Sequence, residues 1–400
     1  MLTETTLTDQ IAAGRHDRLR ILICGAGVAG RTLTQLLRRQ GLHPVLIDKA
    51  APDAASGYML ALMPLVDPTF RTLGITDAYR DRSTPLSRYR ILRHTGSPAR
   101  EYRMTDLFDR YGDYRGISRG ELLESLDATA ATITHHTIVT AIHQTPAATT
   151  ATIQHATQSV TAEFDLVVVA DGINSTTRDL LWPPGDITGL DTGWGGWVTW
   201  ADTDSDPDLG EELWGHGAFL GTYPVKDRLG VILCGPRDRT RIGPDEFSHR
   251  TRAGLTHIST RTDTALREVA TNPEKYYWPL YDRRCARWSL GRVVALGDAA
   301  AGFLPTAGIG AAMAIESATV LAGHLDETGP EQITRQLSAY ERAQRPRVQA
   351  AQDNSRSLAR LMFNTSRAIA ITRDIVAPII PISAALRPIR RLLDNQPALD

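Results

Sequence analysis

The sequence predicts an α/β protein: a Rossmann-like domain with an inserted antiparallel β-sheet domain and C-terminal helices. Near the N-terminus, a short apolar run is followed by a glycine-rich turn and an amphipathic helix. Residues 186–280 differ in composition and pattern: they contain many tryptophans, turns with proline and glycine, and alternating apolar and polar positions. Beyond residue 311 the pattern becomes mostly helical.

The composition is that of an ordinary globular protein. The chain has 400 residues, 42% hydrophobic and 22% charged, which excludes a disordered chain, a collagen-like fibre and a coiled coil. Its formal net charge of −1 argues against nucleic acid or an acidic membrane as the main partner. We recognise no signal peptide and no apolar run long enough to span a membrane. Cys24, Cys234 and Cys285 lie far apart without a CxxC pattern, so we expect no disulfide scaffold, no metal site and a cytoplasmic location.

The first elements form a βαβ unit of about thirty residues. Residues 19–24 form an apolar run typical of a buried parallel strand. Residues 31–40 carry leucines at helical spacing, and Gly41 ends that helix. Residues 43–48 are expected to form the next strand.

The following region mixes helices and strands. Residues 60–79 have a helical pattern broken by two prolines, and residues 86–104 alternate like a β-hairpin that turns at 95–98. Ser118 and Glu121 have the spacing of a capping box, which predicts a helix start. Residues 133–169 indicate a meander of strands.

The second half begins with the predicted sheet domain. Within 186–280, the alternation is clearest at 218–225 and 229–234. Residues 291–296 return to a buried strand. In the helical part that follows, prolines at 346, 378, 381 and 388 are expected to interrupt the helices, and residues 368–393 are expected to form short helices packed on the body.

The most informative motif is Gly25-x-Gly27-x-x-Gly30, which lies between a predicted strand and a helix. Glycines at these positions let the backbone turn tightly and approach a pyrophosphate at the helix N-terminus. Asp48 follows the second strand, where a carboxylate accepts hydrogen bonds from a ribose hydroxyl and disfavours a 2′-phosphate. The motif alone does not separate FAD from NAD.

Two further motifs follow predicted strands. Asp171-Gly172 comes directly after the strand that ends near residue 170, at the edge where α/β sheets bind ligands. The segment 297–310 begins Gly-Asp-Ala-Ala and contains Pro305, Gly308 and Gly310. Asp298 is suited to bind the hydroxyls of a sugar or ribityl chain, and the turn from Gly308 onward aims free amides at developing negative charge.

With these three motifs in this order, roughly residues 19–350 resemble the group A flavoprotein monooxygenases, the single-component hydroxylases of the p-hydroxybenzoate and salicylate hydroxylase type. The resemblance implies an FAD-dependent monooxygenase. It also implies NADPH or NADH as a transient reductant without a Rossmann domain of its own, and transfer of one oxygen atom from O2 through a C4a-hydroperoxyflavin. No catalytic side chain is assigned by it.

The resemblance places FAD against a defined set of residues. By this similarity, the glycine-rich turn would bind the pyrophosphate, Asp48 the adenosine ribose and Asp298 the ribityl chain. Arg119 matches an arginine of the family that contacts the flavin. The full set implied to bind the cofactor is Gly25, Gly27, Val28, Ala29, Gly30, Asp48, Lys49, Arg119, Val139, Asp171, Gly172, Asp298, Pro305, Gly308, Gly310 and Ala311.

The chain departs from the family pattern at several positions. The family often has Glu-Arg where Asp48-Lys49 stands, His at Ala301, Gln at Ile309 and Asn at Ala312. Backbone amides do much of the binding in such loops, so we still expect FAD to bind. The departures bear on flavin mobility and redox potential.

The expected substrate is a hydrophobic, aromatic or polycyclic small molecule. Phe219 and Tyr223 share one face of a predicted strand, and together with Trp214 and His216 they are the substrate-binding candidates. Hydroxylation, epoxidation and Baeyer–Villiger insertion all stay open. So do a related flavoprotein oxidase or reductase and a flavin-bound protein that only binds a metabolite.

These expectations give a domain plan for a monomer or homodimer. The plan has three parts: an FAD-binding domain of residues 18–80, 100–185 and 281–345; a substrate domain of residues 81–99 and 186–280; and a C-terminal helical segment of residues 346–400.

Overall fold

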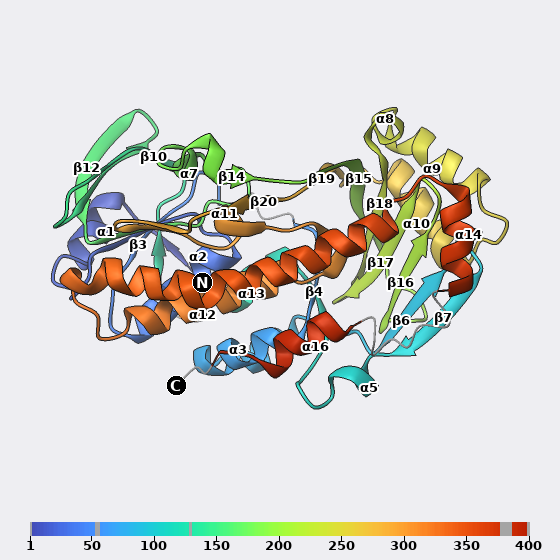
Figure 1. Cartoon of the computed structure of the whole chain (residues 1–400), viewed down its shortest axis with the longest axis horizontal. Helices are drawn as coiled ribbons and strands as arrows, with labels where there is room; N and C mark the ends of the chain where they lie inside the picture. The colour runs from blue at the N-terminus through green and yellow to red at the C-terminus, as the bar shows by residue number, and fades with distance from the viewer. Residues whose placement is uncertain (1, 53–56, 128–129, 377–385, 398–400) are drawn as a thin grey trace.

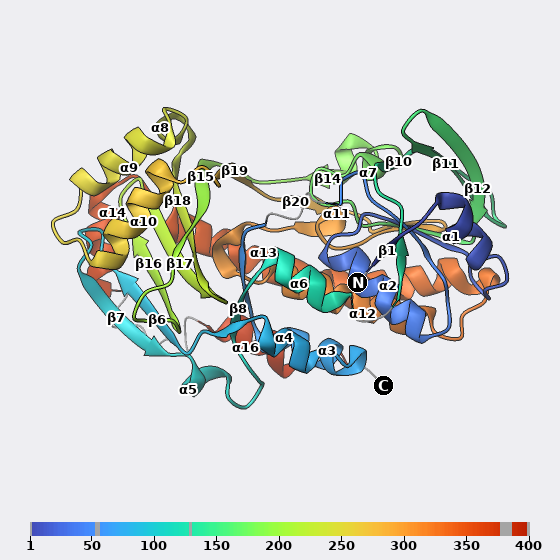
Figure 2. The ribbon, with the colours of Figure 1, turned by 180° about the vertical axis from the view of Figure 1, so that it is seen from behind.

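A mostly parallel sheet and a larger, mostly antiparallel sheet lie at opposite ends of an elongated molecule in the computed structural model (Figure 1). The structure describes residues 2–52, 57–127, 130–376 and 386–397. The long helix α13 (Ile333–Met362) runs from one end toward the other, and the reverse view shows the same arrangement (Figure 2). The cavity described below lies between these two sheets.

The first sheet has five strands in the order β21-β22-β13-β2-β3 and is parallel except for the edge strand β21, which pairs antiparallel with β22. Its strands are β2 (Ile21–Cys24), β3 (Val45–Ile47), β13 (Leu166–Val169), β21 (Ser289–Leu290) and β22 (Val293–Ala295). Every residue of β2, β3, β13 and β22 is buried, because helices and loops cover both faces of the sheet. The expected strands at 19–24, 43–48 and 291–296 are confirmed, each with slightly shorter bounds.

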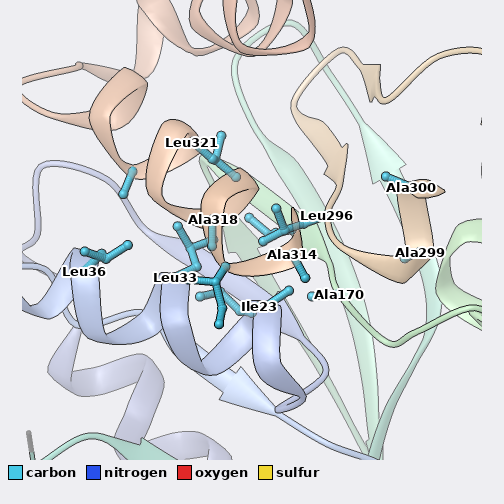
Figure 3. Packing of buried hydrophobic residues seen from close by; sticks show 14 of the residues in the cluster. Ile23, Leu33, Leu36, Ala170, Leu296, Ala299, Ala300, Ala314, Ala318 and Leu321 are labelled. Carbon is cyan, nitrogen blue, oxygen red and sulfur yellow. The ribbon is translucent and has the colours of Figure 1, made fainter. Parts of the chain in front are cut away.

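Two helices pack against each other on one face of this sheet. They are α2 (Val28–Arg39), which ends before Gly41 as predicted, and α12 (Gly310–Leu325). Figure 3 shows Leu33 of α2 next to Ala318 of α12, with Ile23 of β2 beneath them, and all three belong to one buried cluster. Small alanines on α12 let the two helix backbones approach closely, which fixes the position of the glycine-rich turn.

The larger sheet has seven strands in the order β19-β15-β18-β17-β16-β6-β7. Its strands are β6 (Arg88–Leu92), β7 (Pro98–Arg103), β15 (Asp191–Asp202), β16 (Leu209–Trp214), β17 (Phe219–Val225), β18 (Arg228–Pro236) and β19 (Tyr276–Tyr281). The predicted hairpin at 86–104 is confirmed as β6 and β7. It joins the sheet through a parallel pairing of β6 with β16.

One face of this sheet is covered by helices that were not predicted from the sequence. They are α8 (Arg237–Thr240), α9 (Pro244–Ala253) and α10 (Thr260–Thr271). Leu213 and Leu220 of the sheet pack against Phe247 of α9 and Leu266 of α10. The interpretation of 186–280 as all sheet was therefore wrong at 237–271, where apolar residues at helical spacing close a core with the sheet.

The remaining strands form two three-stranded antiparallel sheets and two pairs. The sheet β10-β11-β12 confirms the predicted meander. The strands are β10 (Thr137–Gln144), β11 (Thr149–His155) and β12 (Gln158–Phe164), then β4 (Met59–Leu62), β5 (Thr84–Pro85) and β8 (Arg115–Ser118), and finally β1 (Thr3–Glu4), β9 (Thr132–Ile133), β14 (Ile187–Thr188) and β20 (Arg283–Cys285).

The remaining helices are short apart from α13. They are α1 (Leu7–Ala13), α3 (Asp67–Leu73), α4 (Thr76–Asp81), α5 (Thr105–Phe108), α6 (Arg119–Leu126), α7 (Thr176–Asp179), α11 (Asp298–Ala301), α14 (Arg367–Val376), α16 (Arg387–Asp394) and the 3-10 turns η1 (Pro64–Val66), η2 (Pro184–Asp186), η3 (Pro305–Ala307) and η4 (Pro330–Gln332). Ser118 caps α6 as predicted, since its hydroxyl accepts a hydrogen bond from the Glu121 amide at 3.1 Å.

Two local predictions were wrong. The expected helix at 60–79 begins as strand β4, because Leu60 pairs with Ile117 of β8 and pairing overrides the local pattern. Pro346 does not interrupt α13, since buried Tyr340 and Val348 on either side hold the helix against the body and offset the cost of an internal proline. The prolines at 378 and 381 lie outside the described residues.

Within the described part of the chain, we find no helix whose length and apolarity would let it cross a membrane. The same residues contain no cluster of His, Cys, Asp and Glu suited to bind a metal ion.

Candidate active site

A cavity of about 680 Å³ lies between the carboxyl ends of the parallel strands and one face of the seven-stranded sheet. This volume is typical of pockets that bind small molecules and cofactors. Leu358 and Met362 of α13 and Ile389 of α16 complete its wall. Residues from nearly the whole length of the chain therefore meet in one place.

The glycine-rich turn enters the cavity at the start of α2. Gly25, Gly27, Val28 and Ala29 line the cavity. Gly25 has φ +109°, and a Cβ there would lie 2.4 Å from the Ala170 carbonyl oxygen. At Gly27 a Cβ would meet no atom within 4 Å, so the space beside the helix N-terminus is open.

Gly30 does not line the cavity, contrary to its expected place beside the pyrophosphate. A Cβ at Gly30 would lie 1.9 Å from the carbonyl oxygen of Gly25. Its physical role is therefore to let α2 pack closely on the strand that precedes it.

Asp48 and Lys49 line the cavity at the end of β3. The Asp48 carboxylate accepts hydrogen bonds from the Ala26 amide at 2.6 Å and the Ala50 amide at 2.8 Å. These bonds hold the carboxylate beside the glycine-rich turn. They leave about two of its four lone-pair positions for a ligand hydroxyl.

Arg119 and Val139 also face the cavity. Arg119 is half-buried at the first position of α6, and its amide donates to the Tyr58 carbonyl at 2.9 Å. Within the described part of the chain, its guanidinium makes no ion pair. Val139 lies on β10 at a register shift in its pairing with β11.

The Asp-Gly motif after β13 forms a second edge of the cavity. Asp171 accepts a hydrogen bond from the Ser175 hydroxyl and another from the Thr177 amide at 3.2 Å. Gly172 has φ +88° and open space beside it. Arg178 is buried and donates to the carbonyls of Ile173 and Ala299, so it joins this motif to the Gly-Asp segment without lining the cavity.

Asp298 opens into the cavity at the start of α11, so its side chain is accessible there although protein atoms surround it closely. This surrounding protein raises the pKa of its carboxyl to about 6. Pro305, Gly308, Gly310 and Ala311 line the cavity next to it and lead into α12. Among the described residues, no side chain caps the first amides of α12, which leaves them available to a ligand.

Three of the positions that depart from the family pattern, Ala301, Ile309 and Ala312, are buried. Ala301 and Ala312 are packed in the core and lie outside the cavity, whereas Ile309 lines it. Polar family residues are thus replaced by apolar side chains that pack here.

These features fit a dinucleotide with a flavin. The start of α2, like that of α12, has uncapped amides, and the helix dipole there favours a negatively charged group. Asp48 and Asp298 supply acceptors for hydroxyls at separate points of the cavity, and Arg119 supplies a positive charge.

The sheet face of the cavity carries aromatic side chains. Three of the four substrate candidates, Trp214, Phe219 and Tyr223, line it. His216 does not: its side chain is exposed outside the cavity, with its ring 6.0 Å from that of His94. The expectation for His216 was wrong because it lies in the turn between β16 and β17, where strand alternation no longer directs side chains.

Several residues of this wall were not predicted from the sequence. Glu212 is buried in it, Tyr89 and Trp278 line it from the strands β6 and β19, and Tyr114 lines it from the loop that leads into β8. One signal was available: Glu212 stands two residues before Trp214 on the same strand, so both must share a face. Tyr89 and Tyr114 had no such signal, since their positions depend on the pairing of distant strands.

Comparison with known proteins agrees with this geometry. The FAD binding domain family matches residues 18–355. A 3-amino-4-hydroxybenzoate 2-monooxygenase of Streptomyces platensis is 28% identical over 358 residues, which cover 85% of this chain and 88% of the relative. A 2-heptyl-3-hydroxy-4(1H)-quinolone synthase of Pseudomonas aeruginosa is 27% identical over 326 residues, which cover 76% of this chain and 80% of the relative.

Solved structures share the fold at lower identity. HpxO of Klebsiella pneumoniae, in complex with FAD and uric acid, superposes with a TM-score of 0.78 at 21% identity and covers 94% of this chain and 96% of its own. Pseudomonas aeruginosa PqsL, in complex with 2-aminobenzoylacetate, superposes with a TM-score of 0.74 at 21% identity. The match covers 88% of this chain and 98% of PqsL. With the family match extending over most of the chain, this protein belongs to the FAD binding domain family and is an FAD-dependent monooxygenase of the group A aromatic hydroxylase type.

Proposed function

We propose that the enzyme takes electrons from NADPH or NADH and inserts one oxygen atom from O2 into a hydrophobic, aromatic or polycyclic small molecule. The observation that carries this proposal is a continuous cavity, which joins the glycine-rich turn to an aromatic wall on the sheet. When bound, FAD would supply the redox chemistry that connects the nicotinamide, O2 and the substrate. The names of the relatives, a monooxygenase of 3-amino-4-hydroxybenzoate and a synthase of 2-heptyl-3-hydroxy-4(1H)-quinolone, support an aromatic substrate class.

The chain's own groups would hold FAD along the cavity. In this proposal the uncapped amides at Gly27 and Val28 bind the pyrophosphate, and Asp48 accepts the ribose hydroxyls. Asp298 accepts ribityl hydroxyls, and the amides from Gly308 to Ala311 lie beside the flavin ring. We keep Lys49, Arg119, Val139, Asp171 and Gly172 as further FAD contacts.

The same proposal assigns a separate role to each of the three regions of the chain. The three-part FAD-binding domain would place the cofactor, the substrate domain would bind the small molecule, and the C-terminal helices would exclude water from the cavity. Leu358, Met362 and Phe363 make that side of the wall apolar. Because water is excluded beside an apolar wall, the backbone amides would stabilise developing negative charge more strongly there than in water.

The test is anaerobic reduction of the purified holoenzyme. NADPH and NADH are each mixed with the protein, with and without aromatic compounds, while the flavin absorbance is followed. We expect bleaching that an aromatic compound accelerates. Turnover under 18O2 should then add one labelled oxygen atom to that compound. Bleaching without incorporation of label would indicate an oxidase or reductase, and intact absorbance under every condition would overturn the proposal in favour of a metabolite-binding flavoprotein.

A further inference from the structure

Helix α14 presents an apolar face to the outside of the molecule. It lies beside the seven-stranded sheet, at the end of the molecule opposite the five-stranded sheet (Figure 1). Among the described residues, nine large apolar side chains are exposed, and five of them lie within residues 361–376. Single exposed apolar residues are normal in a soluble protein, whereas a cluster of them marks a contact surface. We call this cluster the α14 face, and its members are Leu361, Ile369, Ile371, Ile375 and Val376.

The orientation of α14 is the reverse of that expected for a helix on a protein surface, because polar side chains point inward and isoleucines point outward. Arg373 is buried beneath the helix, where its guanidinium donates to the carbonyls of Trp214 and Gly215. Asp374 accepts a hydrogen bond from the His94 amide at 3.0 Å, and the same oxygen lies 2.6 Å from Nδ1 of the His94 ring. These contacts fix the rotation of α14, so the isoleucines cannot turn inward unless the contacts break.

The charges near the α14 face are almost all positive. Residues 354–393 contain seven arginines and one acidic residue, Asp374, which is already paired with His94. The arginines of this stretch that are exposed and that form no ion pair within the described part of the chain are Arg360, Arg367, Arg387 and Arg391. The formal net charge of −1 for the whole chain therefore conceals a local excess of positive charge.

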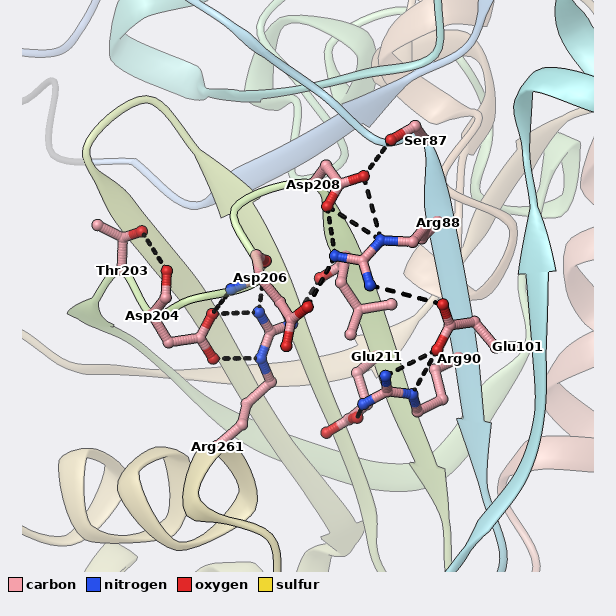
Figure 4. A network of polar contacts seen from close by, with 11 residues as sticks. Ser87, Arg88, Arg90, Glu101, Thr203, Asp204, Asp206, Asp208, Glu211 and Arg261 are labelled. Carbon is pink, nitrogen blue, oxygen red and sulfur yellow. Dashed lines mark hydrogen bonds and ion pairs between the residues drawn. The ribbon is translucent and has the colours of Figure 1, made fainter.

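The helices that carry these arginines lie on one side of the molecule. α13, α14 and α16 stand in front of the other elements in Figure 1 and behind them in the reverse view of Figure 2. Elsewhere in the molecule, arginines have acidic partners: Figure 4 shows Arg88 bound to Asp208 and Arg261 bound to Asp204. The side with α14 thus combines an apolar face with exposed positive charge.

This combination fits the surface of an anionic lipid bilayer. An apolar helix face can enter the boundary between headgroups and acyl chains, while arginines bind the lipid phosphates. A second copy of the chain fits less well, because a twofold contact through the α14 face would bring the same arginines opposite one another, without an exposed acidic residue from this stretch to pair with them.

We infer that the enzyme docks peripherally on an anionic lipid bilayer through the α14 face, with the exposed arginines of α13, α14 and α16 against the headgroups. The isoleucines supply the apolar contact, and the arginines select negatively charged lipid. This inference goes beyond the proposed function and does not depend on the reaction.

The test is co-sedimentation of the purified FAD-loaded protein with lipid vesicles. One set of vesicles contains phosphatidylcholine alone, and the other contains phosphatidylcholine and phosphatidylglycerol in about a three-to-one ratio. We expect the wild type to bind the anionic vesicles about tenfold or more tightly than the neutral ones, and to bind them less tightly as the salt concentration rises. Equal binding to both sets, or no binding to the anionic set, would overturn the inference.

The matched variants for the apolar contact are I371S/I375S and L180S/I242S. Each replaces two exposed apolar side chains, and only the first pair belongs to the α14 face. We expect I371S/I375S to bind anionic vesicles about tenfold more weakly, since the burial of two isoleucines in the lipid is lost, and L180S/I242S to bind like the wild type. Equal effects of the two variants would contradict the inference.

The matched variants for the charge are Arg367→Gln and Arg39→Gln. Arg39 is exposed on α2, in the half of the molecule that holds the five-stranded sheet. We expect R367Q to bind anionic vesicles about fivefold more weakly and R39Q to bind like the wild type. All four variants should keep their flavin and unfolding temperature, because each replaced side chain is exposed.

The alternative occupants give different results. A dimer that I371S/I375S dissociates, in a protein that does not bind vesicles, would assign the α14 face to a second copy of the chain and overturn the inference. Because the vesicle experiment contains no NADPH, NADH or substrate, its failure leaves the oxygenase test untouched, and failure of that test leaves vesicle binding intact.

Discussion

At the residue scale, two glycines of one motif have different physical roles. At Gly27 a Cβ would meet nothing within 4 Å, and the backbone has φ −74°, which alanine adopts freely. At Gly30 a Cβ would lie 1.9 Å from a backbone oxygen that cannot move away. We expect G27A to fold but to lose most of its FAD, because its methyl group fills the space beside the helix N-terminus.

By contrast, we expect G30A to lower stability by several kcal/mol or to prevent folding, since overpacking against backbone is costly. The flavin-to-protein ratio and thermal unfolding of each variant measure the two effects. Gly323→Ala, on an exposed turn of α12 with open space around it, is the control and should keep both FAD and stability. Full FAD content in G27A would contradict the role proposed for Gly27.

Asp67 gives a pH-dependent prediction at the same scale. It lies in the first turn of α3, where burial raises the pKa of its carboxyl from 3.8 to about 6, although a hydrogen bond from the Asp113 backbone opposes the rise. Between these values the folded protein binds a proton that the unfolded chain has lost. Stability therefore falls as the pH rises through this range, and the cost persists above pH 6.

We expect Asp67→Asn to be more stable than the wild type by about 2 kcal/mol at pH 8, after allowance for the lost interaction with the helix dipole. The advantage should shrink toward zero near pH 4. Thermal unfolding at several pH values measures it. Asp77→Asn, an exposed carboxylate in the first turn of α4, should show no such trend. A constant difference between D67N and wild type across pH would rule out this explanation.

At the element scale, a buried ion pair joins α12 to α13. Arg347 binds Glu316 through two contacts of 2.6 and 2.9 Å, and Gln344 donates to the same carboxylate at 2.9 Å. The Glu316 side chain is 5% exposed. Arg347 also donates to the carbonyls of Leu392 and Asn395, which fixes the end of α16.

We expect Arg347→Met to lower the free energy of unfolding by about 3 kcal/mol, because it leaves a buried carboxylate without its cation. The double variant E316L/R347M should recover a large part of that loss, since it removes the stranded charge as well. Urea unfolding followed by tryptophan fluorescence compares the three proteins. A double variant no more stable than R347M alone would show that packing, and not the charge, dominates here.

The sequence allowed prediction of those elements whose burial pattern does not depend on a partner. β2, β13 and β22 are apolar on both faces, so their runs identify them as central strands. β4 reads Met-Leu-Ala-Leu, which suits a helix equally well until β8 pairs with it. The sequence of α10 has a helical pattern, but the segment 237–271 that contains it lies between the strands β18 and β19.

At the scale of the whole molecule, one half of the cavity can be predicted from local sequence patterns, whereas the other half depends on the pairing of distant strands. The half with Gly27, Asp48 and Asp298 is formed by motifs that each follow a strand, and the carboxyl ends of parallel strands meet at one sheet edge, so local patterns suffice to predict it. The sheet side of the cavity depends on the parallel pairing of β6 with β16, which brings Tyr89 and Glu212 together across more than a hundred residues. No local pattern encodes that pairing.

Because the cavity is lined from both sheets and the C-terminal helices, FAD should stabilise the molecule as a unit. Removal of FAD is expected to lower the unfolding temperature by several degrees, and added FAD should restore it in a concentration-dependent way, with about 4 kcal/mol gained at a thousandfold excess over the dissociation constant. ADP should give a smaller shift, since it can reach only the amides and Asp48 near α2. G27A should lose the response to FAD, whereas E212Q should keep it, because Glu212 lies on the sheet side of the cavity. An unfolding temperature that does not change with FAD would mean that FAD does not bind the folded protein in preference to the unfolded chain, which contradicts the prediction.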